Sequence, residues 1–179
     1  MAEIRSDARR NRERLLEAAT AAFSRGGPVS LEAIAREAGV GIGTLYRHFP
    51  NREALVEAIY RAELTEVAAA AERLLALHPP RTALRLWMDR YAAFVAAKRG
   101  MAESLHAIFD SGAMQPSQTR GSIVGAVDLL LRAGADDDSL RPDVRADDVV
   151  SSLIGIFLAS GSPEQTGRML DLLVAGIAR

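Results

Sequence analysis

The chain has no cysteine, only three histidines and a single tryptophan among its 179 residues. The absence of cysteine excludes disulfide bonds, thiol redox chemistry and zinc sites with cysteine ligands. The histidines, His48, His78 and His106, fall in different predicted segments, so we expect no metal site. The chain also lacks GxSxG, HExxH and a phosphate-binding glycine loop, and nothing places Ser, His and Asp as a triad. We therefore expect a protein that is not an enzyme and that carries no cofactor.

Long hydrophobic runs are missing as well. The longest stretch without a charged residue, 149–163, is shorter than the roughly 20 residues that a membrane-spanning helix needs. The first fifteen residues, MAEIRSDARRNRERL, are highly charged and contain no apolar core of a secretory signal. The sequence thus predicts a soluble, cytoplasmic protein that does not associate with a membrane.

The residues that dominate the chain favour helices. Alanine, leucine, arginine and glutamate are abundant, β-branched residues are sparse, and no strictly alternating apolar pattern occurs. The expected fold class is all-α, with a three-helix N-terminal head in residues 1–51 and a larger helical body in residues 52–179. The expected helical segments are 7–24, 31–38, 41–49, 52–77, 82–99, 101–110, 116–133, 145–160 and 164–178.

Several of these segments begin or end at residues that commonly cap helices. Ser30 is a good N-cap for the second segment, and Gly39 stands where a helix is often closed by a left-handed glycine. The last segment starts with a capping-box pattern, Ser162 followed by Gln165. Glycine and proline at 26–28, and Gly134, are expected to end the first and seventh segments.

Charge is distributed unevenly along the chain. Residues 1–52 hold nine arginines and six acidic residues, a balance of +3, whereas the remainder holds thirteen basic and seventeen acidic residues, a balance of −4. A mildly basic head on an acidic body is a weak indication of nucleic-acid binding, and a solvated arginine-rich helix face is the plainer explanation.

The stretch VGIGTLYRHFPNR, residues 40–52, carries more information. A helix over 41–49 directs Leu45 and Phe49 to the core, and it directs Ile42 and Tyr46 to a different, outward face. Glycine is a poor helix former but allows another backbone to approach closely. An exposed isoleucine and tyrosine beside glycines and arginines therefore suggest a surface that docks into something.

A DNA major groove fits that surface. The groove admits a helix, and a thymine methyl group offers an apolar contact for Ile42. Its phosphates would attract arginines and the hydroxyl groups of Thr44 and Tyr46, while Ser30 and its helix N-terminus could hold another phosphate. Two short helices joined by a tight turn form the helix-turn-helix arrangement. The alternative is a plain surface helix that caps the head.

The segment SLEAIAREAGVGIGTLYRHFPNREALVEAIY, preceded by LLEAATAAF, closely resembles the N-terminal signature of the tetracycline-repressor (TetR/AcrR) family of bacterial transcription regulators. The resemblance covers roughly residues 12–60, about a quarter of the chain. The remainder is similar to the family only in being helical and of suitable length.

The resemblance implies a reading helix at 41–48 and a double-stranded DNA operator as partner. In the family, the residues at Ile42 and Gly43 face base edges, and those at Thr44, Tyr46 and His48 typically touch the backbone. The implied DNA-binding residues are Arg5, Arg9, Arg10, Ser30, Gly41, Ile42, Gly43, Thr44, Tyr46, Arg47, His48 and Arg52. Residues 41–43 offer almost no hydrogen-bonding side chains, so the operator sequence cannot be inferred. His48 could instead simply cap or pack at the helix end.

One short reading helix buries too little surface for tight binding, so a homodimer on a palindromic operator is expected. The last two helical segments are apolar around a wide arc and supply a candidate interface; a buried core helix is the alternative. In the family these two helices pair across a two-fold axis. The candidate interface residues are Val150, Leu153, Ile154, Phe157, Met169, Leu170, Leu173 and Ile177.

By the same resemblance, the body should hold a pocket for a small-molecule effector, and we expect that effector to be largely apolar. The candidate lining residues are Trp87, Tyr91, Phe94, Met101, Leu105, His106 and Phe109. Plain core is the plainer explanation for each of them, and His106 with Asp110 could be a polar anchor, a pH-sensitive pair or a solvated surface pair.

Family habit favours a repressor that an effector releases from DNA, although an activator is an open alternative. A second alternative is a helical interaction module whose head no longer binds DNA. The regulator hypothesis predicts DNA affinity that falls steeply with salt, whereas the interaction module predicts weak, salt-insensitive association.

Overall fold

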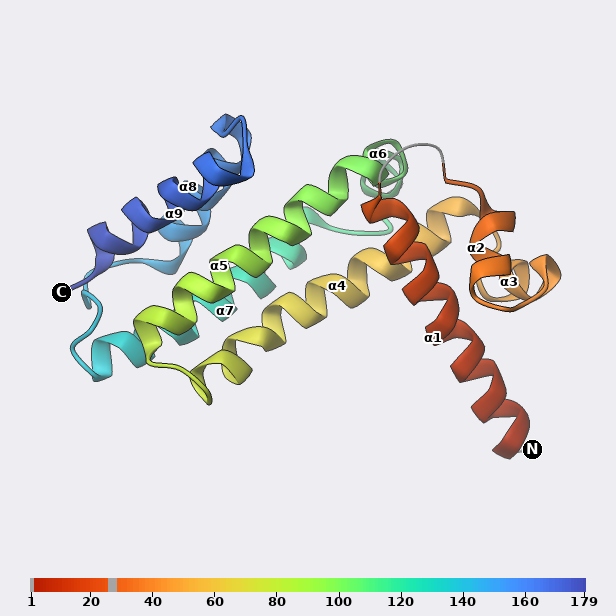
Figure 1. The fold of residues 1–179 in the computed structure, drawn as a ribbon, viewed down its shortest axis with the longest axis horizontal. Helices are drawn as coiled ribbons and strands as arrows, with labels where there is room; N and C mark the ends of the chain where they lie inside the picture. The colour runs from red at the N-terminus through yellow and green to blue at the C-terminus, as the bar shows by residue number, and fades with distance from the viewer. Residues whose placement is uncertain (1, 26–28) are drawn as a thin grey trace. The chain divides into compact units, whose positions relative to one another are not determined.

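The computed structural model describes residues 2–25 and 29–179, with the side chains of 2–6, 24, 99 and 100 left out of that description. Within these residues the chain forms nine α-helices, one short 3-10 helix and no strand, which confirms the expected all-α class (Figure 1). Their bounds are α1 Ala2–Ser24, α2 Leu31–Glu37, α3 Ile42–His48, α4 Arg52–Leu75, α5 Pro80–Ala97, η1 Lys98–Met101, α6 Ala102–Asp110, α7 Pro116–Asp136, α8 Ala146–Ala159 and α9 Pro163–Ile177. None of these helices combines the length and the apolar character that crossing a membrane requires.

The helices group into two compact units. The first unit consists of Met1–Ala62 and Ala97–Gln115, and the second consists of Glu63–Ala96 and Pro116–Arg179. Helix α4 contributes its N-terminal half to the first unit and its C-terminal half to the second.

The first unit consists of a small helical core and of the segment Ala97–Gln115, which contains α6. Helix α1 packs against α2 and α3, and α2 packs against α3. The side chains buried in this unit include Leu15, Ala19, Phe23, Ile34, Leu45, Phe49, Leu55, Val56 and Ile59. Arg61 of α4 donates a hydrogen bond of 2.9 Å to the carbonyl of Ala113, and the ring of Tyr60 meets the ring of Phe109 edge-on at 6.0 Å. The segment after α5 is thus fastened to α4.

The second unit has its core between α5, α7, α8 and α9. Helix α8 packs against both α7 and α9. Its buried side chains include Leu84, Trp87, Met88, Ile123, Val127, Leu130, Leu140, Val149, Val150, Leu153, Leu170 and Val174. Arg120 of α7 binds the Asp147 carboxylate (2.9 Å) and the Ser151 hydroxyl (2.9 Å) of α8, which ties the starts of the two helices together.

Three of the expected helix caps are confirmed. Ser30 is the N-cap of α2 and accepts a hydrogen bond from the amide of Ala33 (3.3 Å), and Gly39 has a φ of +65°. Ser162 is the N-cap of α9 and accepts from the amide of Gln165. The Gln165 side chain accepts a hydrogen bond of 2.9 Å from the amide of Gly161, one residue before the N-cap, and not from the Ser162 amide as in a capping box.

Five predicted helix ends lie two or more residues from the observed ones. Helix α4 ends at Leu75 instead of residue 77, and α5 ends at Ala97 instead of residue 99, because the 3-10 helix η1 begins at Lys98. Helix α1 begins before residue 7, because good helix formers extend it without any apolar periodicity. Helix α5 begins at Pro80, since proline is well tolerated in the first turn. Helix α7 runs past Gly134 to Asp136, so this glycine does not end it. The glycine and proline expected to end the first segment, residues 26–28, lie outside the described residues; α1 itself ends at Ser24.

Candidate DNA-binding site

The turn between α2 and α3 is tight and well bonded. The amide of Gly39 donates to the carbonyl of Arg36 (3.1 Å), and the amide of Val40 donates to the carbonyl of Ala35 (2.9 Å). Gly41 has an extended backbone and serves as the N-cap of α3, whose first bond runs from the amide of Thr44 to the Gly41 carbonyl at 2.8 Å. Two short helices separated by this turn form a helix-turn-helix in the first unit.

Helix α3 presents two distinct faces. Leu45 is fully buried and Phe49 is 2% exposed, whereas Ile42 is 38% exposed and Tyr46 is 46% exposed. The predicted inward and outward directions of these four residues are therefore confirmed. Gly41, Gly43 and Arg47 are also exposed, and Thr44 and His48 are half-buried. The outward face offers an aliphatic group, a phenol and a guanidinium from three neighbouring positions.

Ser30 lies at the start of α2 but already has partners. Besides capping Ala33, its hydroxyl donates a hydrogen bond of 2.6 Å to the carboxylate of Glu32. This hydrogen bond lowers the pKa of Glu32, so its carboxylate stays charged at neutral pH. A phosphate that approached Ser30 would meet that negative charge.

Two arginines bind aromatic rings inside the first unit. The guanidinium of Arg52 lies 5.0 Å from the centroid of the Phe23 ring and donates a hydrogen bond of 2.8 Å to the carbonyl of Val29. The guanidinium of Arg12 lies 5.3 Å from the centroid of the Phe49 ring. Sequence reasoning missed the role of Arg12, because its ring partner is 37 positions away and only the fold brings them together.

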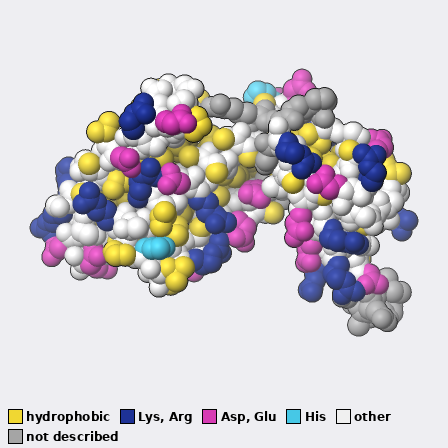
Figure 2. All heavy atoms as spheres, in the orientation of Figure 1, with side chains coloured by type: hydrophobic (Ala, Val, Ile, Leu, Met, Phe, Trp, Pro, Cys, Tyr) yellow, Lys and Arg dark blue, Asp and Glu magenta, His cyan; other side chains and the backbone are white. Residues whose placement is uncertain are grey.

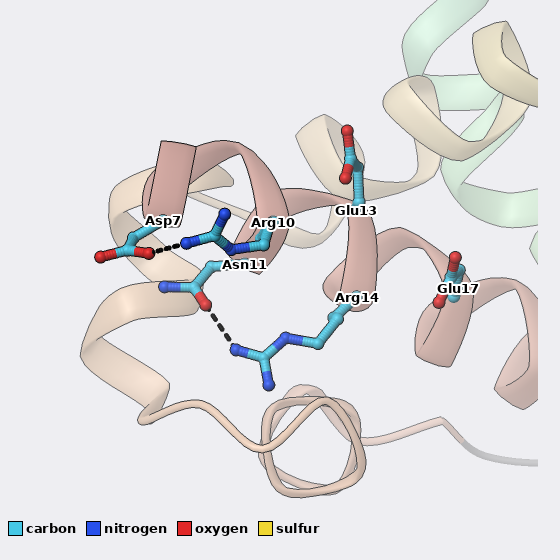
Figure 3. A pocket seen from close by; sticks show the side chains of 6 residues that line it. All are labelled: Asp7, Arg10, Asn11, Glu13, Arg14 and Glu17. Carbon is cyan, nitrogen blue, oxygen red and sulfur yellow. Dashed lines mark hydrogen bonds and ion pairs between the residues drawn. The ribbon is translucent and has the colours of Figure 1, made fainter. Parts of the chain in front are cut away.

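Three other arginines of α1, Arg9, Arg10 and Arg14, bind acidic or amide groups of the same helix; Figure 3 shows the contacts of Arg10 and Arg14. Arg9 pairs with Glu13 at 3.6 Å, and Arg10 pairs with Asp7. Arg14 donates to the side chain of Asn11 at 2.5 Å. These side chains border an open hollow of about 630 Å³, lined by Asp7, Arg10, Asn11, Glu13, Arg14 and Glu17. Because both signs of charge line this hollow, it does not favour an anion or a cation. The side chain of Arg5 lies outside the described residues.

The predicted dimer residues are divided between core and surface. Val150, Leu153, Phe157, Leu170 and Ile177 are buried within their own chain, and Met169 and Leu173 are half-buried. Ile154 is 38% exposed. Two neighbouring leucines are far more open, Leu158 at 82% and Leu172 at 73%. In the space-filling view, hydrophobic side chains reach the surface among charged ones over the region of α8 and α9 (Figure 2).

The predicted pocket residues fall into two sets, one in each unit. In the second unit Trp87, Tyr91 and Phe94 are buried. The ring of Tyr91 stacks on the rings of the other two, with centroid separations of 5.4 Å to Trp87 and 6.2 Å to Phe94. The indole N–H of Trp87 donates to the carbonyl of Val67 at 2.9 Å, so this group is satisfied within the protein. In the first unit Met101 and Leu105 are buried, Phe109 is half-buried and His106 is exposed. Among the described residues no cluster of side chains is suited to a metal ion.

Lys98, the first residue of η1, is a partly buried titratable group that the sequence did not indicate, and its side chain lies against α4. The ammonium of Lys98 lies 4.8 Å from the centroid of the Tyr60 ring and donates to the Tyr60 hydroxyl at 3.3 Å. Burial lowers the pKa of Lys98 to about 8.

Both parts of the chain match known families of regulators. Residues 15–59 match the family described as bacterial regulatory proteins, tetR family. Residues 79–179 match the family described as transcriptional regulator SbtR-like, C-terminal domain.

Solved structures and curated proteins agree with these matches. The TetR transcriptional regulator SCO0520 from Streptomyces coelicolor is 43% identical, with a TM-score of 0.83 over 93% of this chain and 98% of that chain. A TetR transcription regulatory protein from Mycobacterium vanbaalenii is 30% identical, with a TM-score of 0.77 over 98% of this chain and 99% of that chain. A curated HTH-type transcriptional regulator of Staphylococcus aureus strain USA300 is 40% identical over 63 residues. That last match spans 34% of this chain and only 34% of the length of the curated relative.

Proposed function

Because the chain belongs to the tetR family of bacterial regulatory proteins, we propose that it is a repressor that binds a palindromic operator as a homodimer and leaves it when a small-molecule effector binds. The chain is a DNA-binding transcriptional regulator and not an enzyme. We propose three further properties of this regulator: repression, binding to a palindromic site and release by an effector. A regulator of bacterial genes acts where the DNA is, so we place it in the cytoplasm.

The observation that carries the DNA-binding proposal is the outward face of α3. Ile42 and Tyr46 are exposed one helical turn apart, with Arg47 beside them and no side chain at 41 or 43. In a major groove, Ile42 would contact thymine methyl groups while Tyr46 and Arg47 would bind phosphates. Glycines at 41 and 43 would let the helix backbone approach the base edges.

The two parts of the chain have separate tasks in this proposal. Residues 1–51 bind DNA, and residues 52–179 bind the effector and form the dimer. The exposed apolar side chains of α8 and α9, Ile154, Leu158 and Leu172, support the dimer because an isolated chain would leave them in water. The buried aromatic residues of α5 support an effector that is largely apolar.

The first experiment selects fragments of bacterial genomic DNA with the purified protein and titrates the winning fragment at several salt concentrations. We expect a palindromic site and a logarithm of affinity that falls linearly with the logarithm of salt concentration. A transcription assay on that site then separates a repressor from an activator. If no fragment is enriched, or if binding is indifferent to salt, the helix-turn-helix does not bind DNA and the proposal fails.

A further inference from the structure

We propose that Arg52 is a positioning residue of the helix-turn-helix: its guanidinium joins the end of α1, the segment that leads into α2 and the start of α4, and so sets the direction of α2 and α3. Family resemblance assigns this arginine to a DNA phosphate instead. The proposal rests on the proposed function, since what is positioned is the DNA-reading surface.

Arg52 places a positive charge at the N-terminus of α4. Asn51 caps α4 by accepting a hydrogen bond from the amide of Ala54 at 2.8 Å, so Arg52 occupies the first position of the helix. A positive charge there is unfavourable, because the N-terminus of a helix carries a partial positive charge of its own. The interaction with the helix dipole therefore does not explain an arginine at this position.

The contacts of Arg52 explain why an arginine stands there. Its planar guanidinium lies over the ring of Phe23, a residue that is 2% exposed, and donates a hydrogen bond of 2.8 Å to the Val29 carbonyl. Val29 immediately precedes Ser30, the N-cap of α2. A flat cation with several donors can stack on a ring and hold a carbonyl at the same time, which few other side chains can do.

The geometry connects these contacts to α3. Helix α2 begins at Leu31, packs against α3 and is joined to it by the bonded turn at Gly39. Fixing the carbonyl of Val29 therefore fixes the start of a rigid pair of helices. Arg12 acts at the opposite end of the helix-turn-helix, where it covers the ring of Phe49, the C-cap residue of α3. The helix-turn-helix is thus held at both ends by an arginine on a buried ring.

The test compares Arg52→Gln with Arg47→Gln, which removes an exposed charge from α3. Hydrogen exchange of peptides covering residues 29–34 is measured without DNA, and DNA affinity is measured as a function of salt. For Arg52→Gln we expect several-fold faster exchange in that peptide, an affinity lower by about tenfold, and an unchanged salt slope. For Arg47→Gln we expect unchanged hydrogen exchange. A dimer would lose two phosphate contacts, so the slope of log affinity against log salt concentration should be smaller by about 1.8.

Arg52→Lys separates charge from shape. A lysine can replace an arginine at a phosphate as a point charge, but it lacks the planar fork. We expect Arg52→Lys to recover only part of the affinity and of the slow exchange. The inference is overturned if Arg52→Gln lowers the salt slope while exchange in residues 29–34 stays unchanged, or if Arg52→Lys restores full affinity. If the unmodified protein binds no DNA, the proposed function fails, and the exchange data still decide whether Arg52 holds this segment.

Discussion

At the scale of single residues, Gly43 occupies the second position of α3 although the fold does not need a glycine there. A Cβ atom added at this residue would meet no other atom within 4 Å, and the residue lies in the α-helix. Glycine weakens a helix relative to alanine because it gives up more conformational freedom on folding. A small, exposed, stability-lowering residue on the proposed reading face indicates close approach by a partner.

We predict that Gly43→Ala will raise the free energy of unfolding by up to about 1 kcal/mol and will weaken DNA binding. Thermal melting and DNA titration measure the two effects. Gly121→Ala on α7, where a Cβ also meets nothing, serves as control and should stabilise the protein without changing DNA affinity. Unchanged DNA affinity in Gly43→Ala would mean that DNA does not approach this residue closely.

The shifted pKa of Lys98 predicts how the free energy of unfolding depends on pH. Its pKa is about 8 in the folded chain and 10.5 ordinarily, so between these values the unfolded chain binds more protons. The free energy of unfolding of the unmodified protein should therefore rise between pH 8 and pH 10.5 relative to that of Lys98→Met, and their difference should be constant below pH 8. Urea unfolding of both proteins at pH 7, 8, 9 and 10 measures the difference. Parallel curves over the whole range would show that Lys98 titrates normally.

The outward face of α3 could be predicted from the sequence because it depends on local helical spacing, which fixed the directions of Ile42, Leu45 and Tyr46. The ring partners of Arg12 and Arg52 could not be predicted in this way. Each partner lies more than 25 positions from its arginine, and a pair of this kind leaves no periodic signal in a single sequence.

At the scale of whole elements, α7 shows a glycine that serves packing. Leu140 is fully buried, its amide donates to the carbonyl of Gly134 at 2.9 Å, and a Cβ at Gly134 would lie 2.3 Å from the Leu140 side chain. The chain after α7 therefore folds back onto the helix at Gly134, where the absence of a side chain makes room for Leu140. The C-terminus adds to this arrangement, because the Arg141 amide donates to the carbonyl of Ile177 at 3.0 Å.

Two substitutions on α7 should accordingly have effects of opposite sign. Gly134→Ala forces Leu140 to move and should lower the free energy of unfolding by about 1–3 kcal/mol. Gly125→Ala, on the same helix with open space around it, should raise it by up to about 1 kcal/mol. Denaturant unfolding of the two variants is the measurement. Equal stability of both would contradict the packing of Leu140 on Gly134.

The same glycine shows where sequence-based prediction of elements succeeds and fails. Ser30, Gly39 and Ser162 cap helices through bonds within a few residues, and the sequence located them correctly. Gly134 looks like another helix end, yet it lies inside α7, because a tertiary contact with Leu140 decides its role. Predictions of helix ends hold where the stabilising bonds are local.

At the scale of the whole molecule, the proposed dimer would bury side chains that the single chain leaves uncovered. The sequence predicted a wide apolar arc on α8 and α9, but a one-dimensional pattern cannot divide that arc between the chain's own core and a partner. In the structure, Leu153 and Leu170 lie in the core, whereas Leu158 and Leu172 are mostly exposed. The two exposed leucines are therefore the best positions at which to separate dimerisation from folding.

We predict that the double substitution Leu158→Glu with Leu172→Glu will leave the chain folded but monomeric, because both side chains are outside its core and charges would oppose burial against a second copy. DNA affinity should then fall by at least about 100-fold, since each half-site is bound alone. Analytical ultracentrifugation and DNA titration measure the two effects.

Leu77→Glu is the matched control for the double variant. Leu77 is 75% exposed in the α4–α5 connection, so this variant should remain a dimer with unchanged DNA affinity. A double variant that still sediments as a dimer would place the interface elsewhere, and a monomer with full DNA affinity would show that one helix-turn-helix suffices for binding.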